Sequence, residues 1–292
     1  MIHLSRACEL APTFGGAHFA LARIYRGIGK KEKAQQHLAL YQKDKLGWPT
    51  LPDPLLADIL ALRNSSTDYL RRGIELAEQG QLKEAAEEHE AAVEIDPTLV
   101  QAHVNLIRLY GQLGEPSRAE EHYRAALEMA PHLAELHYNY GVLLNDRDPA
   151  GGAEAFRRAL ELKPNYAEAH NNYALFLMLS GKLDDAVRHY RMALEERPDY
   201  RAARFNLGRI LVLQGQFDEA ISHLRQTLLP KDDETPQFAY ALGAAYARSG
   251  NRAEALRYMR EARKKATALG QSALLASIER DLQNLENAPS PQ

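Results

Sequence analysis

The chain has 292 residues, of which 45% are hydrophobic and 26% charged, and its formal net charge of −3 is small, as in ordinary folded proteins. Because 36 Lys and Arg residues are outnumbered by 39 Asp and Glu, the sequence lacks the basic surplus that nucleic-acid binding normally requires. The single cysteine, Cys8, excludes an internal disulfide and a CxxC metal or redox motif, so packing must supply the stability.

The amino-terminal residues 1–14 predict one helix, with Leu4 and Ala7 on its packed side and Pro12 after it. This helix matches only the second half of the helix pairs that follow. We expect either a natural start with this helix as a cap or a fragment of a longer protein. We favour the fragment, because capping elements are usually more polar.

No apolar run approaches the roughly 20 residues of a membrane-spanning helix, and the first six residues lack the apolar core of a signal peptide. We therefore expect a soluble chain, cytoplasmic by default. A targeting signal upstream of Met1 stays open, because a fragment would lack it.

Residues 15–48 predict the first complete helix pair, and residues 49–65 predict an insertion with a short apolar helix. Three prolines between Trp48 and Leu55 interrupt the regular pattern. We favour a packed connector here. The alternative is that Trp48 and the short helix lie across a binding groove as a lid.

Beyond residue 65 the sequence repeats. Prolines recur 34, 33 and 34 residues apart, an alanine lies five residues before each, and a glycine stands at the predicted end of most first helices. The prolines are Pro97, Pro131, Pro164 and Pro198; the alanines are Ala92, Ala126, Ala159 and Ala193; the glycines are Gly80, Gly114, Gly181, Gly215 and Gly250. Glycine ends a helix in the left-handed conformation, alanine permits close helix contact, and proline stops the second helix.

This order of aromatic, Leu-Gly, aromatic, Ala, aromatic, Ala and Pro resembles the tetratricopeptide repeat family over about residues 1–269. The resemblance implies an all-α, right-handed superhelix of about seven helix-turn-helix repeats whose first helices line a concave surface. We place the repeats at 15–48, 66–99, 100–133, 134–166, 167–200, 201–235 and 236–269. Residues 270–286 predict a capping helix, and residues 287–292 a disordered tail.

Four consecutive repeats carry an asparagine at the same position of the first helix: Asn105, Asn139, Asn172 and Asn206. Asparagine is a mediocre helix former, and its amide matches the C=O and N–H groups of a peptide backbone. The ladder resembles the one on the repeat superhelix of O-linked N-acetylglucosamine transferase, whose catalytic domain this chain lacks. We predict that the asparagines bind an extended polypeptide, among Gln101, Arg108, Gln112, Glu135, Tyr138, Val142, Asp146, Asn171 and Arg209.

The alternative role for the asparagines is to bond the neighbouring repeat and hold the stack. Binding predicts that replacing Asn139 and Asn172 by alanine weakens peptide affinity about tenfold with little change in stability. A stacking role predicts the reverse.

Eleven histidines invite a metal or catalytic interpretation, but eight of them recur once per repeat. One set occupies the tryptophan position of the family, and the other lies near the aromatic position of the second helix. The sets are His18, His103, His137 and His170, and His37, His122, His189 and His223. Because neighbouring members of the first set are too far apart to share an ion, we predict packing roles, no metal and no cofactor.

No GxSxG, SxxK or Cys-His arrangement occurs, so we predict that the chain is not an enzyme. The predicted function is a scaffold or adaptor that binds an extended protein or peptide. Two alternatives stay open: a substrate-recruiting arm of a larger enzyme, and a structural module that assembles end to end.

Overall fold

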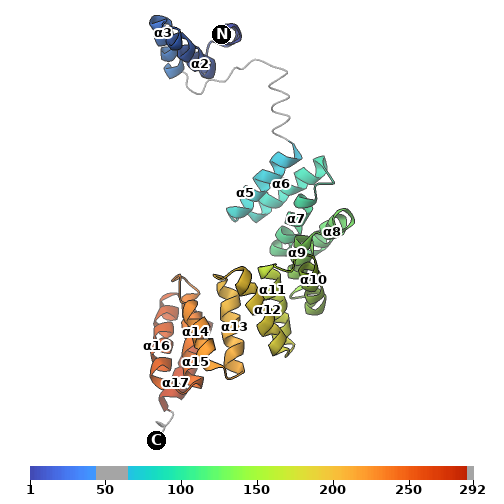
Figure 1. Cartoon of the computed structure of the whole chain (residues 1–292), viewed down its shortest axis with the longest axis vertical. Helices are drawn as coiled ribbons and strands as arrows, with labels where there is room; N and C mark the ends of the chain where they lie inside the picture. The colour runs from blue at the N-terminus through green and yellow to red at the C-terminus, as the bar shows by residue number, and fades with distance from the viewer. Residues whose placement is uncertain (44–64, 288–292) are drawn as a thin grey trace. The chain divides into compact units, whose positions relative to one another are not determined.

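A computed structural model of the chain describes residues 1–43 and 65–287, and all regular secondary structure in these residues is α-helical (Figure 1). The chain divides into an amino-terminal part, Met1–Asp68, and a carboxy-terminal part, Tyr69–Gln292. Trp48, almost all of the predicted insertion and the last five residues lie outside the described residues. Within the described ranges, no helix combines the length and apolarity needed to cross a bilayer.

The amino-terminal part contains α1 (Ile2–Leu10), α2 (Gly15–Gly27) and α3 (Lys31–Lys43). Helix α2 packs against both α1 and α3. The buried apolar side chains of this part are small or aliphatic: Ala11, Ala17, Leu21, Ala22 and Ala34. Four of these five residues are alanines, which favours close approach of the helices.

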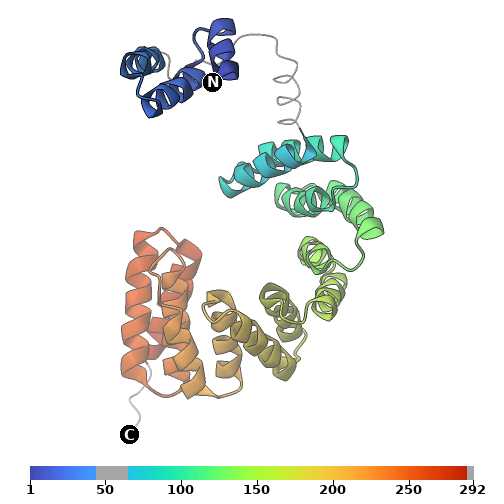
Figure 2. The same cartoon turned by 45° about the horizontal axis from the view of Figure 1, so that its top comes forward.

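The carboxy-terminal part is a series of antiparallel helix pairs that follow one another along an arc (Figure 2). Its first helices are α5 (Ser66–Glu78), α7 (Val100–Leu113), α9 (Ala134–Leu144), α11 (Ala167–Leu179), α13 (Arg201–Leu213) and α15 (Thr235–Arg248). Its second helices are α6 (Leu82–Ile95), α8 (Pro116–Met129), α10 (Pro149–Leu162), α12 (Leu183–Glu196), α14 (Phe217–Gln226) and α16 (Arg252–Ala268). The last helix is α17 (Ser272–Asn287).

The first helices end where glycine adopts the left-handed backbone conformation. The five glycines predicted as helix stops have φ between 75° and 83°. The repeat at 134–166 lacks such a glycine. There, Asp148 caps α10 by accepting a hydrogen bond from the backbone N–H of Gly151, at 3.0 Å.

Small residues at fixed positions allow the two helices of a repeat to pack closely. Ala92, Ala126, Ala159 and Ala193 have no exposed surface. At Gly141, an added Cβ atom would lie 2.6 Å from the ring of Phe156 and 3.1 Å from the carbonyl oxygen of Gly152. The glycine therefore makes room for the large side chain of the partner helix.

Helix α17 covers the last repeat. Its Ile278 and Leu282 are buried against Ala262, Ala266 and Met259 of α16. An all-α repeat fold of seven helix pairs with a carboxy-terminal capping helix is thus confirmed for the described residues.

Candidate functional site

Contacts between successive first helices join α7 to α9, and α11 to α13 and α13 to α15, so their outward sides form a surface in two stretches. We call the exposed side chains on this surface the exposed wall: Arg108, Gln112, Val142, Asp146, Leu179, Arg209 and Leu213. Leu179 and Leu213, which the sequence did not single out, are 77% and 58% exposed.

Two of the predicted asparagines face the preceding repeat. Asn105 and Asn139 are only 8% and 7% exposed. The Asn105 amide nitrogen lies 3.3 Å from Nε2 of His89, and the Asn139 amide donates to the carbonyl oxygen of Val104 at 3.2 Å. These contacts correspond to the stacking role considered above.

The other two asparagines are half-buried. The Asn172 amide nitrogen lies 3.5 Å from the hydroxyl of Tyr138, and its oxygen accepts from Asn171 at 3.0 Å. Burial raises the pKa of Tyr138 to about 12, so its hydroxyl stays protonated at neutral pH. Asn172 thus bonds the preceding repeat as well, but Asn172 and Asn206 both keep part of their surface open to solvent.

Some of the remaining predicted residues are buried or half-buried, and the others are exposed. Gln101 is half-buried and donates to the Asn105 side-chain oxygen at 3.2 Å, and Glu135 is half-buried as well. Asn171 is buried, at 7% exposure. Five residues of the predicted set belong to the exposed wall: Arg108, Gln112, Val142, Asp146 and Arg209.

A hollow of about 1060 Å³ lies at the carboxy-terminal end of the wall, between α13, α15 and the start of α17. We call it the terminal hollow. Its apolar lining includes Met178, Val212, Leu213, Ala241, Ala244 and Leu274. The position that carries asparagine in four earlier repeats is here Ala241, which leaves space in place of an amide.

Charged groups of both signs border the terminal hollow. Arg209 and Arg248 lie on the first helices, and Asp233 and Glu234 lie in the loop before α15. Two hydrogen bonds fix the α17 side of the hollow: Tyr240 donates to Asp281 at 2.6 Å, and Gln271 donates to the Asp233 carbonyl at 2.7 Å. The walls are thus held in place by helix packing and by these bonds.

The two histidine sets meet within repeats. The Nδ1 atoms lie 2.9 Å apart in His18–His37, 3.0 Å apart in His103–His122 and 2.8 Å apart in His170–His189, always 19 residues apart in sequence. Nε2 of each first-helix histidine bonds the carbonyl oxygen of Pro12, Pro97 or Pro164, at 2.9, 3.1 and 2.8 Å. His137 bonds Pro131 in the same way, at 2.9 Å.

These proline contacts fix the tautomer of the first-helix histidines. A carbonyl oxygen only accepts, so Nε2 carries the proton in the neutral ring and Nδ1 has a free lone pair. Nδ1–H of the second-helix histidine donates to that lone pair. Burial lowers the pKa of His189 to about 4, which keeps this ring neutral at pH 7.

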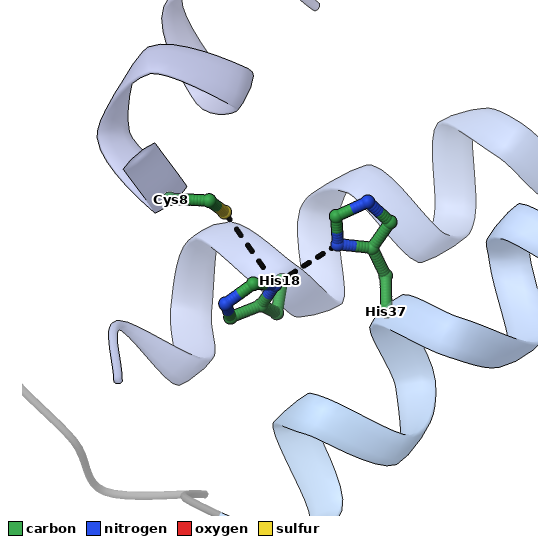
Figure 3. A group of neighbouring side chains, drawn as sticks. All are labelled: Cys8, His18 and His37. Carbon is green, nitrogen blue, oxygen red and sulfur yellow. Dashed lines mark hydrogen bonds between the residues drawn. The ribbon is translucent and has the colours of Figure 1, made fainter. Parts of the chain in front are cut away.

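In the amino-terminal pair, His18 and His37, the thiol of Cys8 lies beside the two rings. Cys8 Sγ lies 3.5 Å from Nδ1 of His18, and the three side chains come from α1, α2 and α3 (Figure 3). Burial raises the pKa of the Cys8 thiol.

Family models described as tetratricopeptide repeat match residues 76–138 and 177–245, residues 142–200, and residues 236–261. These stretches contain the glycine stops, the alanine positions and the prolines described above. The chain belongs to the tetratricopeptide repeat family. In tetratricopeptide repeats the tryptophan position belongs to the first helix, and here histidine occupies it in four repeats.

Solved tetratricopeptide repeat structures share the fold. PilF of Pseudomonas aeruginosa is 18% identical over 74% of this chain and 97% of its own, with a TM-score of 0.65. PilW, a type IV pilus biogenesis factor, is 22% identical over 73% and 97%, with a TM-score of 0.62. YrrB, described as having an unusual peptide-binding site, is 22% identical over 67% and 99%, with a TM-score of 0.54. No curated protein matches the sequence.

The terminal hollow and the histidine pairs were missed by the sequence analysis. The members of one histidine set lie in different repeats and are far apart, whereas the pairs form between the two sets, across the turn of a single repeat. The constant separation of 19 residues in three repeats was the available signal. No sequence signal indicated the terminal hollow, because the hollow depends on where α17 begins relative to α13 and α15.

Proposed function

We propose that this protein is an interaction scaffold that binds an extended polypeptide along the exposed wall and anchors an apolar side chain in the terminal hollow. The observation that carries the proposal is the hollow itself, about 1060 Å³ in volume and lined by several apolar side chains. Exposed Leu179 and Leu213 extend this apolar character along the wall.

The charged rim supports a polypeptide as the ligand. Arg209 and Arg248 suit acceptor groups of a bound chain, and Asp233 and Glu234 suit its donors. Asn172 and Asn206 are half-buried, and in this proposal they contact the backbone of the bound chain. Asn105 and Asn139 serve the stack. YrrB, whose name mentions a peptide-binding site, has the same fold.

The test is a screen of displayed random peptides against the 292-residue chain, followed by affinity measurements on the selected peptides. Leu213→Asp is expected to weaken binding by about tenfold or more, because it places a charge at the apolar wall. Arg209→Glu is expected to change the affinity according to the charge of the peptide.

The matched control is Arg263→Glu, since Arg263 is exposed on α16, away from the residues that line the hollow. It is expected to leave the affinity unchanged. If Leu213→Asp and Arg263→Glu bind the selected peptides as tightly as the wild type does, the hollow is not the binding site. Sedimentation of the wild type as a dimer or larger species would instead favour end-to-end assembly.

A further inference from the structure

The cluster at Cys8, His18 and His37 differs from every other histidine contact in the described residues. Its ligand atoms, one sulfur and two ring nitrogens, all lie within 4.8 Å of one another (Figure 3). The three residues belong to three different helices of the amino-terminal part. Their convergence therefore depends on the fold and not on nearness in sequence.

The His18 ring is oriented as a metal ligand would be. Its Nε2–H donates to the carbonyl oxygen of Pro12 at 2.9 Å, which leaves the Nδ1 lone pair directed at Cys8 and His37. A histidine that binds a metal usually donates its other N–H to a carbonyl or carboxylate in this way. The ring is 4% exposed, so its position is fixed by the surrounding protein.

The His37 ring is held as well. It stacks on the ring of Tyr25, with centroids 5.5 Å apart and an interplanar angle of 16°. Its Nδ1 faces Nδ1 of His18 at 2.9 Å. The Nδ1 atoms of His18 and His37 thus face each other on two rings that the surrounding protein holds in place.

A hydrogen bond between the two rings explains why His18 and His37 lie together. It does not explain why the Cys8 thiol lies beside them. The residue ten positions before the first histidine is Cys8 in the amino-terminal pair, Val93 before His103 and Leu160 before His170. The other two pairs therefore have an aliphatic side chain where this one has sulfur. His18 offers one lone pair, and the neighbouring ring already uses it, so the Cys8 thiol gains little from the contact.

We propose that Cys8, His18 and His37 form a binding site for a divalent transition-metal ion of the Zn²⁺ type, with a fourth position for water. One thiolate and two imidazoles are a ligand set that zinc accepts, and three protein ligands leave one tetrahedral position open. The ion binds His18 and His37 through Nδ1 and Cys8 through Sγ.

The observed geometry lies close to what the ion needs. In a tetrahedral zinc site, two nitrogens lie about 3.4 Å apart, and a sulfur and a nitrogen about 3.6 Å. The distances here are 2.9 Å between the two nitrogens and 3.5 Å from Cys8 Sγ to His18 Nδ1, and the ligand atoms of Cys8 and His37 lie within 4.8 Å of each other. Small side-chain rotations would open the nitrogen pair and admit the ion.

The protons balance in this step. Cys8 loses its S–H proton to solvent when the Zn–S bond forms. His37 exchanges its Nδ1–H for an Nε2–H and stays neutral, and His18 is already protonated on Nε2. Binding therefore releases one proton per ion, and affinity rises with pH.

The first test uses the wild-type chain, in which Cys8 is the only cysteine. After treatment with a chelator, one equivalent of Zn²⁺ is expected to slow the reaction of the thiol with Ellman's reagent by at least about tenfold, because metal-bound thiolate is withdrawn from attack. One equivalent of Co²⁺ is expected to give a thiolate-to-cobalt charge-transfer band. No protection by Zn²⁺ and no such band would overturn the proposal.

Variants then separate this site from the other pairs. Cys8→Val, which installs the residue found at the matching position before His103, is expected to abolish the cobalt band and to weaken Zn²⁺ binding by more than about 100-fold, beyond the effect of a lost outer partner. His37→Ala is expected to weaken binding comparably, and its matched control His189→Ala to leave the cobalt band and the protection of Cys8 unchanged. Equal effects of His37→Ala and His189→Ala on the cobalt band would contradict the proposal, and circular dichroism reports whether each variant is folded.

Discussion

Asn139 on α9 and Ala241 on α15 occupy the same position of their repeats, and their surroundings differ. Asn139 is 7% exposed and bonds the Val104 carbonyl of the preceding repeat, whereas Ala241 lines the terminal hollow. The region around α7 and α9 is tightly packed, and the region around α13 and α15 is hollowed. A repeated position therefore has no fixed role, because the neighbouring helix decides whether a side chain bonds, packs or borders a space.

The largest expected effect tests the close packing of the α9 repeat. Gly141→Ala places a Cβ atom 2.6 Å from the Phe156 ring and 3.1 Å from the Gly152 carbonyl, so we expect a loss of about 3 kcal/mol of unfolding free energy. Urea unfolding followed by circular dichroism measures it. The matched control is Gly111→Ala on α7, where the nearest side-chain atom is 3.4 Å away. There, alanine is expected to stabilise by up to about 1 kcal/mol, and equal effects at the two glycines would show that the packing is not tight.

The second prediction concerns acid sensitivity of the same packed region. Burial and the charge of Arg108 lower the pKa of His89 to about 4 in the folded protein, below the ordinary value near 6.5. The folded state therefore binds fewer protons, and the stability is complete above about pH 6.5 and falls as the pH drops toward 4. Between pH 7 and pH 5 we expect this group to lose about 2 kcal/mol.

His89→Phe removes the pH-dependent contribution of His89 to stability. It keeps an aromatic ring at this position, as Phe156 does at the equivalent position of a later repeat. Urea unfolding at pH 7 and pH 5 should show a smaller loss for the variant than for the wild type. His189, whose pKa is also lowered to about 4, keeps part of the acid sensitivity. Identical losses in the two proteins would show that His89 does not titrate in this range.

Asn139→Ala tests the bond between repeats. The variant loses the hydrogen bond to the Val104 carbonyl, so we expect about 1 kcal/mol of destabilisation in urea unfolding and little change in peptide affinity. Asn206→Ala, at the half-buried end of the ladder, is the comparison and is expected to destabilise less. A strong loss of binding in Asn139→Ala at unchanged stability would restore the ladder as the peptide site.

The smallest expected effect on stability is at the exposed wall. Arg209 is exposed, and its guanidinium lies 5.5 Å from the centroid of the Phe205 ring. Because surface substitutions rarely matter, Arg209→Ala should change the unfolding free energy by less than about 0.5 kcal/mol. Thermal unfolding measures this. A larger change would show that this part of the wall supports the fold as well as the site.

Several features of the fold were predictable because they depend on local chemistry. The glycine stops follow from the left-handed conformation that glycine tolerates. Small residues at Gly73, Ala92 and Ala126 follow from the narrow space between the two helices of a repeat. The capping helix followed from apolar residues at helical spacing between 271 and 286. The candidate site was less predictable: the spacing of the asparagines placed them on first helices, but not on the buried or the exposed side.

The helix pairs, their order and the family can be read from the sequence, because helix periodicity and chain reversal depend on residues close together in the chain. Three features depend on how the helices pack: Asn105 and Asn139 are buried against the preceding repeat, α13, α15 and α17 border a hollow, and Cys8 meets His18 and His37. Each of these depends on the rotation of one helix against another. That rotation is set by all the side chains at the contact together, and no single position in the repeat records it.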